Sequence, residues 1–173
     1  MQTVAEHASQ LLQLGAEVYR MRVSVPVLVE LAVRATGPDA DFLTRTLDGP
    51  LGRETVEASD AIAPRPRVAP DAAVHLVRKR PKAPFPERIG IGRAGTDVVL
   101  AYPLVSKYHA FIREDDDRWF LCDAGSRNGT FFEHVRLERG QSVPLTDECM
   151  LRIGPYGFFF YSPDGFLTFL QGL

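Results

Sequence analysis

Three short stretches of this chain carry side chains suited to binding an anion. Arg93, Lys107 and Arg127 supply cationic groups, and Ser106 adds a small hydroxyl donor. A phosphorylated side chain brings a charge of about −1.5 to −2 and three acceptor oxygens, so its receptor needs fixed cations and neutral donors. The planar guanidinium of arginine can bind two phosphate oxygens at once, which makes Arg93 the main candidate anchor. These residue types predict a local anion site.

The three stretches stand in a defined order along the chain. They are Gly92-Arg93, then Ser106 to His109, then Gly125 to Thr130, with strand-like segments between them. In this order they resemble the signature of the forkhead-associated (FHA) domain family, which is Gly-Arg, Ser-x-x-His and Asn-Gly-Thr. The resemblance covers roughly residues 71–161.

The resemblance to FHA domains implies both a fold and a function. It implies a β-sandwich without catalytic activity that captures phosphothreonine in a partner protein. It also implies a phosphopeptide-binding site in which the phosphate is surrounded by Arg93, Ser106, Lys107 and Arg127, and the peptide backbone is held by Asn128. The site is supported structurally by Gly92, His109, Gly129 and Thr130. The preference for threonine over serine rests on the resemblance alone.

The chain departs from the family pattern at two places. Many members have a second Asn-Gly turn about four residues after Asn-Gly-Thr, where this chain has Glu133-His134. We therefore expect the following hairpin to differ in shape. Lys107 stands where the family uses several residue types, so its contact with phosphate is less specified than those of Arg93 and Ser106.

From residue 71 onward the pattern is that of short strands separated by turns. The predicted strands are Ala73 to Val77, Arg88 to Arg93, Val98 to Leu100, Ala110 to Arg113, Trp119 to Asp123, Thr130 to Phe132 and Phe158 to Tyr161. The turn signals are Gly95, Asp115 to Asp117, Asn128-Gly129 and Gly154-Pro155. This pattern predicts a mainly β fold, a sandwich of two packed sheets. Ser162-Pro163-Asp164 predicts the start of a short C-terminal helix.

The front of the chain has a helical pattern. Apolar residues recur at three- and four-residue steps from Val4 to Met21, which predicts an amphipathic helix. Pro26 and Pro38 favour two further helices, which end at about Arg34 and Leu47. Together these segments predict an N-terminal helical extension.

Prolines and glycines then punctuate residues 48–70, as in a linker. The predicted organisation is therefore a helical region (1–47), a linker (48–70) and an FHA-like β-sandwich domain (71–173). Three short helices make a thin core. We expect them to pack on the sandwich, on a second copy in a dimer, or on a partner.

Composition excludes several classes of protein. The net charge is −2, with 20 Lys and Arg against 22 Asp and Glu, so nothing global attracts nucleic acid or an anionic membrane. We interpret the basic run Arg78 to Lys82 as a solvated loop, because no aromatic and basic stacking platform accompanies it in the sequence. Two cysteines do not make a secreted disulfide framework, and no apolar run of about 18 residues could span a bilayer. We expect a cytoplasmic protein.

Catalysis and metal binding find little support in the residues. Ser106 and His109 could begin a hydrolase triad, but no Gly-x-Ser-x-Gly elbow surrounds Ser106 and no acid is placed to orient His109. Histidines and cysteines are scattered without the paired spacings of zinc sites. The sequence predicts no catalytic residue, no metal and no cofactor.

Two functions from different classes remain. The first is a phosphothreonine-dependent adaptor, whose partners are phosphothreonine-containing proteins, namely a Ser/Thr kinase or its substrates. The alternative is a phosphate-independent scaffold or self-assembly protein. Such a protein would dock through apolar surface, for which the front helices and the aromatic segment Phe158 to Tyr161 are the candidates.

Overall fold

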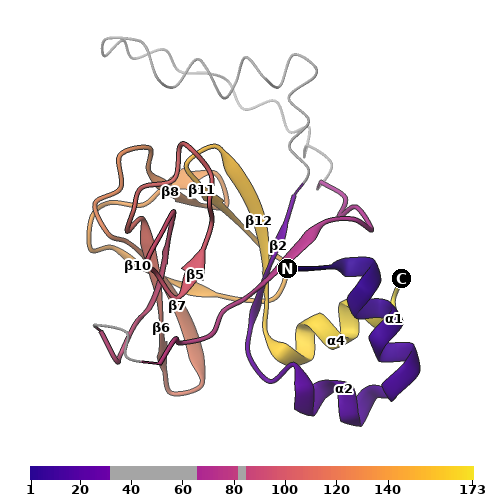
Figure 1. Cartoon of the computed structure of the whole chain (residues 1–173). Coiled ribbons are helices and arrows are strands. Elements are labelled where there is room, and N and C mark those ends of the chain that lie inside the picture. Colours follow the sequence, from indigo (N-terminus) through magenta and orange to yellow (C-terminus); the bar gives the residue numbers. More distant parts are fainter. Residues whose placement is uncertain (32–65, 82–84) are drawn as a thin grey trace, which may run out of the picture.

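The computed structural model describes residues 1–31, 66–81 and 85–173, which form a mainly β fold of two packed sheets (Figure 1). The seven-stranded sheet has the order β1 (Gln2–Thr3), β3 (Ala73–Leu76), β2 (Val27–Glu30), β12 (Tyr156–Tyr161), β11 (Cys149–Ile153), β8 (Thr130–Phe132) and β9 (Val135–Arg136). The five-stranded sheet has the order β10 (Ser142–Leu145), β7 (Arg118–Asp123), β6 (Ala110–Asp115), β4 (Ile89–Gly92) and β5 (Val98–Val99). Only β4 and β5, among these neighbours, run parallel. The predicted sandwich is confirmed.

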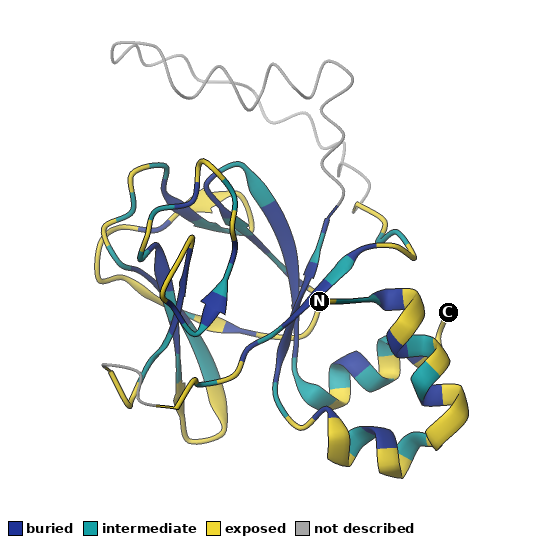
Figure 2. Cartoon of the chain, in the orientation of Figure 1, coloured by how far each residue is buried: buried dark blue, intermediate teal, exposed yellow. Residues whose placement is uncertain are grey.

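The main core fills the space between the two sheets. Its buried members include Ile91, Ile112, Leu121, Leu151 and Phe158. In β11 every second residue is buried, as expected of a strand that packs on one face. Figure 2 shows the buried residues along the facing strands and the exposed ones in the connecting turns. Burial of these alternating apolar side chains is what holds the two sheets together.

Strand β12 is buried on both faces. Phe158 and Phe160 point into the core between the sheets, whereas Phe159 and Tyr161 belong to a second core beneath the helices. All four aromatic side chains are buried. The prediction that Phe158 to Tyr161 could serve as an exposed docking surface is therefore wrong, because helices cover the face that the sequence pattern left open.

Helices α1 (Val4–Leu14), α2 (Ala16–Arg22) and α4 (Pro163–Gln171) cover the outer face of the seven-stranded sheet near β2 and β12 (Figure 1). Thr3 caps α1 in a capping box with Glu6, and Ser162 caps α4 by accepting the amide of Gly165. The predicted C-terminal helix is thus confirmed. None of the helices in the described ranges is long and apolar enough to cross a membrane.

The single helix predicted from Val4 to Met21 is two helices in the structure. Gly15 separates them with φ of 76°, a left-handed conformation that glycine adopts without steric cost. The bend lets both helices pack on the sheet and on each other. His7 in α1 and Tyr19 in α2 are both buried, and their Nδ1 and hydroxyl oxygen lie 2.7 Å apart.

The helix predicted from Pro26 to about Arg34 is wrong over its described part. Val27–Glu30 forms β2, which pairs with β12 on one side and β3 on the other. A strand buried on both faces reads as a continuous apolar run, and periodicity cannot tell such a run from a buried helix. Pairing with strands distant in the sequence decides the outcome.

The remaining predictions for the front of the chain fall mostly outside the described residues. These are the helix from Pro38 to about Leu47 and most of the linker at 48–70, so the division into three regions stays a prediction. The described strands on either side of this segment, β2 and β3, are antiparallel neighbours, with Val27 opposite Leu76. Chain on both sides of the predicted linker therefore belongs to one sheet.

The hairpin at Glu133-His134 keeps the form that Asn-Gly would favour. Phe132 pairs with Val135, which leaves a two-residue turn between β8 and β9. The φ angles of Glu133 and His134 are 44° and 71°, and positive φ at both central residues is the requirement of a type I′ turn. The expected difference in shape is therefore not seen, and two ordinary L-residues hold a conformation that strains them.

Candidate anion-binding site

The register of the five-stranded sheet brings three strand ends to one edge. β4 ends at Gly92, β6 begins at Ala110 and β7 ends at Asp123. Ile91 pairs with Ala110, and Ala110 pairs with Asp123. The loops 93–97, 100–109 and 124–129 therefore leave the sheet at this edge, and they contain the three sequence motifs.

Hydrogen bonds join the three loops to one another. The Arg93 amide donates to the Ser106 carbonyl at 2.9 Å, and the Arg127 amide donates to Ser106 Oγ at 3.1 Å. Asn128 Nδ2 donates to the Leu104 carbonyl at 2.7 Å. The 100–109 loop thus lies between the other two, and Ser106 is the residue that contacts both.

Gly92 is required by the close approach of the first two loops. A Cβ added at this position would lie 2.2 Å from the carbonyl oxygen of Lys107, which is backbone and cannot move aside. Gly92 is buried and precedes Arg93 directly. The absence of a side chain is therefore what allows Arg93 to sit against the Ser106 segment.

His109 connects the second and third loops from within. Its Nδ1 accepts the Ser106 amide at 3.0 Å, and its Nε2 lies 3.0 Å from the Gly129 carbonyl, so the neutral ring carries its proton on Nε2. The ring is fully buried, and burial lowers the pKa of His109. Because both ring nitrogens are engaged with the backbone, His109 has no free nitrogen with which to deprotonate Ser106.

Asp123 is a site residue that the sequence analysis missed. Its Oδ2 accepts the amides of Gly125 and Ser126, and its Oδ1 accepts the hydroxyls of Ser126 and Thr130. Burial by itself raises the pKa of Asp123, but these hydrogen bonds outweigh burial and hold it below its usual value. An Asp two residues before a glycine at the end of a strand is an Asx-turn signal that could have identified it.

The cationic candidates are exposed at this edge. Within the described part of the chain, the Arg93 Nη1 makes a single long contact of 3.5 Å, with the Pro103 carbonyl. Arg127 and Lys107 are exposed as well, and among the described residues none of the three forms an ion pair. The Lys107 backbone packs against Gly92, but no contact joins its ammonium group to the other candidates, so its role stays a prediction.

The stability of the fold is expected to decrease as the pH falls below about 6.5. His7, His75 and His109 are buried, and burial lowers the pKa of each. The unfolded chain, with histidine pKa near 6.5, therefore takes up protons first. The folded state therefore keeps its full free energy of unfolding above about pH 6.5. Below that pH the free energy of unfolding falls by up to about 1.4 kcal/mol per pH unit for each histidine.

Denaturant unfolding at about pH 7.5, 6.5 and 5.5 measures this dependence, with the larger drop expected in the lower interval. Proton spectra of the imidazole rings in the same series would identify which histidine titrates. An unchanged free energy of unfolding between the two lower pH values would contradict the prediction.

Comparison with known proteins finds similarity to FHA domains over part of the chain. Residues 89–154 match the family model of the FHA domain. The chain is 33% identical over 61 residues to the probable E3 ubiquitin-protein ligase dma1 of Schizosaccharomyces pombe, over 33% of this chain and 23% of that protein. It is 35% identical over 69 residues to the ABC transporter ATP-binding/permease protein Rv1747 of Mycobacterium tuberculosis, over 40% of this chain and 7% of that protein. Among solved structures, Mycobacterium tuberculosis EmbR in complex with a low affinity phosphopeptide aligns at 31% identity with a TM-score of 0.40, over 44% of this chain and 20% of that chain.

The residues that match the FHA domain, 89–154, include all three motifs. FHA domains are interaction modules, in general without enzymatic activity. The chain spans less than a quarter of the length of these relatives.

Proposed function

We propose that this protein binds phosphothreonine peptides through the three loops and performs no catalytic step. The observation that carries the proposal is the set of hydrogen bonds that gathers the Arg93, Ser106 and Arg127 backbones at one edge of the sandwich. Three exposed cations without ion pairs among the described residues supply the charge that a phosphate dianion needs.

Each side chain has donors left for the ligand. Ser106 Oγ accepts the Arg127 amide, so its own proton can be donated to a phosphate oxygen. Arg93 offers its guanidinium fork, and Lys107 and Arg127 add charge around the phosphate. Asn128 gives one N–H to the Leu104 carbonyl and keeps its second N–H and its carbonyl oxygen for the peptide backbone. The braced loops need little reordering on binding, which favours affinity.

The class of partner follows from the ligand. A phosphothreonine is made by a Ser/Thr kinase, so the partner is such a kinase or one of its substrates, and the protein acts as an adaptor between them. We place it in the cytoplasm, because Cys122 and Cys149 are buried free thiols that suit a reducing compartment.

The test is a titration of the full chain with a degenerate phosphothreonine peptide library. Unphosphorylated and phosphoserine versions of the same library serve as matched controls. We expect a dissociation constant of about micromolar for the phosphothreonine library alone. Equal affinity for the phosphorylated and unphosphorylated libraries would overturn the proposed function.

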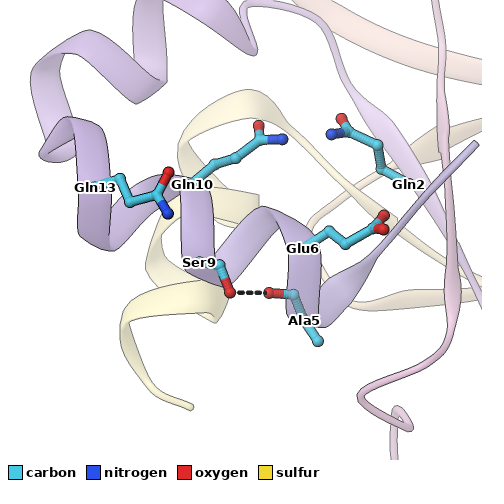
Figure 3. Close-up of a pocket in the computed structure, with 6 residues that line it drawn as sticks. All are labelled: Gln2, Ala5, Glu6, Ser9, Gln10 and Gln13. Carbon is cyan, nitrogen blue, oxygen red and sulfur yellow. Dashed lines mark hydrogen bonds between the residues drawn. The ribbon is translucent and has the colours of Figure 1, made fainter.

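A second candidate function is phosphate-independent docking through the N-terminal helices. Leu12, Val18 and Met21 are exposed on α1 and α2, which favours an apolar contact with a second copy or a partner. Another face of α1 is polar, and Figure 3 shows Glu6, Gln10 and other polar side chains around a hollow there. Binding that survives phosphatase treatment of the partner would support this candidate over the first.

A further inference from the structure

Two arginines outside the proposed site lie against the two ends of the 124–129 loop. A Cβ added to Gly125 would lie 3.3 Å from Arg139 Nε, and one added to Gly129 would lie 2.8 Å from Arg136 Nε. Both glycines have positive φ. The two guanidinium groups therefore pack on the bare backbone at either end of the loop that carries Arg127.

The backbone holds these arginines in place. Arg136 lies in β9, which pairs with β8. The backbone of Arg139 forms an isolated parallel β-bridge with that of Asp123. The buried Leu137, which lies between Arg136 and Arg139 in the sequence, donates its amide to the Thr130 carbonyl at 2.8 Å. The segment 136–139 thus runs along the strands that begin and end the loop, so regular contacts hold the backbone of both arginines beside it.

Positive charge accumulates beside the loop. Arg152 in β11 stacks on Phe131, with its Cζ 3.5 Å from the ring centroid. Burial lowers the pKa of Arg152, and the nearby charge of Arg136 lowers it further. Across the described ranges, neither of these arginines nor Arg139 is paired with a carboxylate. Like charges held together in this way favour binding of an anion.

A hollow of about 550 Å³ opens at this place. It is lined by Arg136 and Arg139 together with Gly125, Ser126, Leu137, Asp123 and Glu138. Both carboxylate oxygens of Asp123 accept hydrogen bonds from within the loop and its flanking strand. The lining therefore holds two carboxylates: Asp123, which is buried and already hydrogen-bonded within the loop and its flanking strand, and the exposed Glu138, which is free to oppose an incoming anion, against two guanidinium groups that attract it.

We infer that this hollow is a second anion subsite, which takes a carboxylate or a second phosphate from the same phosphothreonine peptide. The inference rests on the proposed function, because Arg127 in the loop centre would contact the phosphothreonine while Arg136 and Arg139 hold the second group. Gly125 and Gly129, on which the two arginines pack, are each two residues from Arg127. An extended peptide reaches it within about two to four residues of the phosphothreonine, at roughly 3.3 Å per residue.

The experiment uses the full chain and a positional library of phosphothreonine peptides. Each sublibrary carries Glu or, as its match, Gln at one position within about four residues on either side of the phosphothreonine. We expect Glu to bind roughly three- to tenfold more tightly than Gln at one or more positions. The preference should vanish in Arg136→Gln/Arg139→Gln and persist in Arg136→Lys/Arg139→Lys, which keeps the charge.

Two further variants sharpen the result. Arg118→Gln removes an exposed charge at the other end of β7 from the loop and should leave the preference unchanged. Glu138→Gln removes the opposing carboxylate and should increase it. At the preferred position, phosphoserine in place of Glu distinguishes the two sources, because a phosphate-selective subsite binds it more tightly still and a carboxylate-selective subsite does not.

The outcomes separate the two proposals. Equal binding of Glu and Gln sublibraries at every position, or a preference that persists in the Arg136→Gln/Arg139→Gln variant, would overturn the subsite. The proposed function would then stand, since the phosphothreonine dependence is unaffected. Loss of phosphothreonine dependence in all sublibraries would overturn the proposed function and the subsite together.

Discussion

Replacing Arg93 with alanine is expected to weaken phosphothreonine-peptide binding by about ten- to hundredfold, or about 1.4 to 2.8 kcal/mol. The guanidinium is exposed and makes one long contact with the Pro103 carbonyl, so its donors are available to phosphate. A bidentate pair with a dianion is among the strongest contacts that such a surface can form. The free energy of unfolding should change little, because the substitution removes few contacts of the Arg93 side chain.

Isothermal titration with a phosphothreonine peptide measures the effect. Arg93→Lys keeps the charge without the planar fork and should recover part of the affinity. Arg118→Ala, at the far end of β7, is the matched control and should bind as the wild type does. Unchanged affinity in an Arg93→Ala variant with an unaltered melting temperature would refute the proposed site.

Replacing Asp123 with alanine is expected to lower the free energy of unfolding by about 2 to 4 kcal/mol. The substitution removes the acceptor for two amides and two hydroxyls, and the Thr130 hydroxyl is fully buried, where it has no access to water. A buried donor without an acceptor costs the desolvation of that group. For a chain of this length the loss corresponds to a decrease of roughly 4 to 16 °C in melting temperature.

Asp123→Asn is the conservative control for this prediction. It keeps one acceptor oxygen for the loop amides and replaces the other with a donor, so about half of the loss is expected. Denaturant unfolding of both variants measures the difference. A loss below about 1 kcal/mol for Asp123→Ala would show that the loop does not depend on this carboxylate.

The seven strands predicted after residue 71 are all present, because local alternation and turn chemistry specify them. Asp116 and Asp117 form the β6–β7 turn with positive φ, and Gly95, Gly129 and Gly154 adopt the left-handed conformation at the other predicted turns. Strand β11 was not predicted, although its alternating Cys149, Leu151 and Ile153 carried the same signal. Strand β10 was not predicted either, because it contains Pro144, and proline is found in sheets almost only in edge strands such as this one.

The front of the chain shows where a local sequence pattern is insufficient to predict secondary structure and packing. Val27 to Val29 and Phe158 to Tyr161 are both continuous apolar runs, and both lie in central strands of the seven-stranded sheet. The partners of β2 are β3 and β12, which lie far away in the sequence, so no short window contains the information that makes Val27–Glu30 a strand. The same distance explains why α1 and α2 could not be assigned to the sheet that they cover.

The residue types of the candidate site were readable from the sequence, since Arg93, Ser106 and His109 stand in recognisable motifs. The hydrogen bonds that connect these residues to one another could not be predicted from the sequence. The sequence could not indicate that the Arg127 amide donates to Ser106 Oγ, or that the Leu104 carbonyl accepts a hydrogen bond from Asn128 Nδ2. These contacts join residues of separate loops, and only the register of the strands brings them together.

Local patterns were enough to predict the β-sandwich, the C-terminal helix and the chemistry available at the loops, because alternation, capping and side-chain charge are local properties. The tertiary structure alone decided that β2 belongs to the sheet, that Phe158 to Tyr161 are covered, and that Arg136 and Arg139 flank the 124–129 loop. Each of these depends on packing between segments far apart in the chain, where burial and register outweigh local preference.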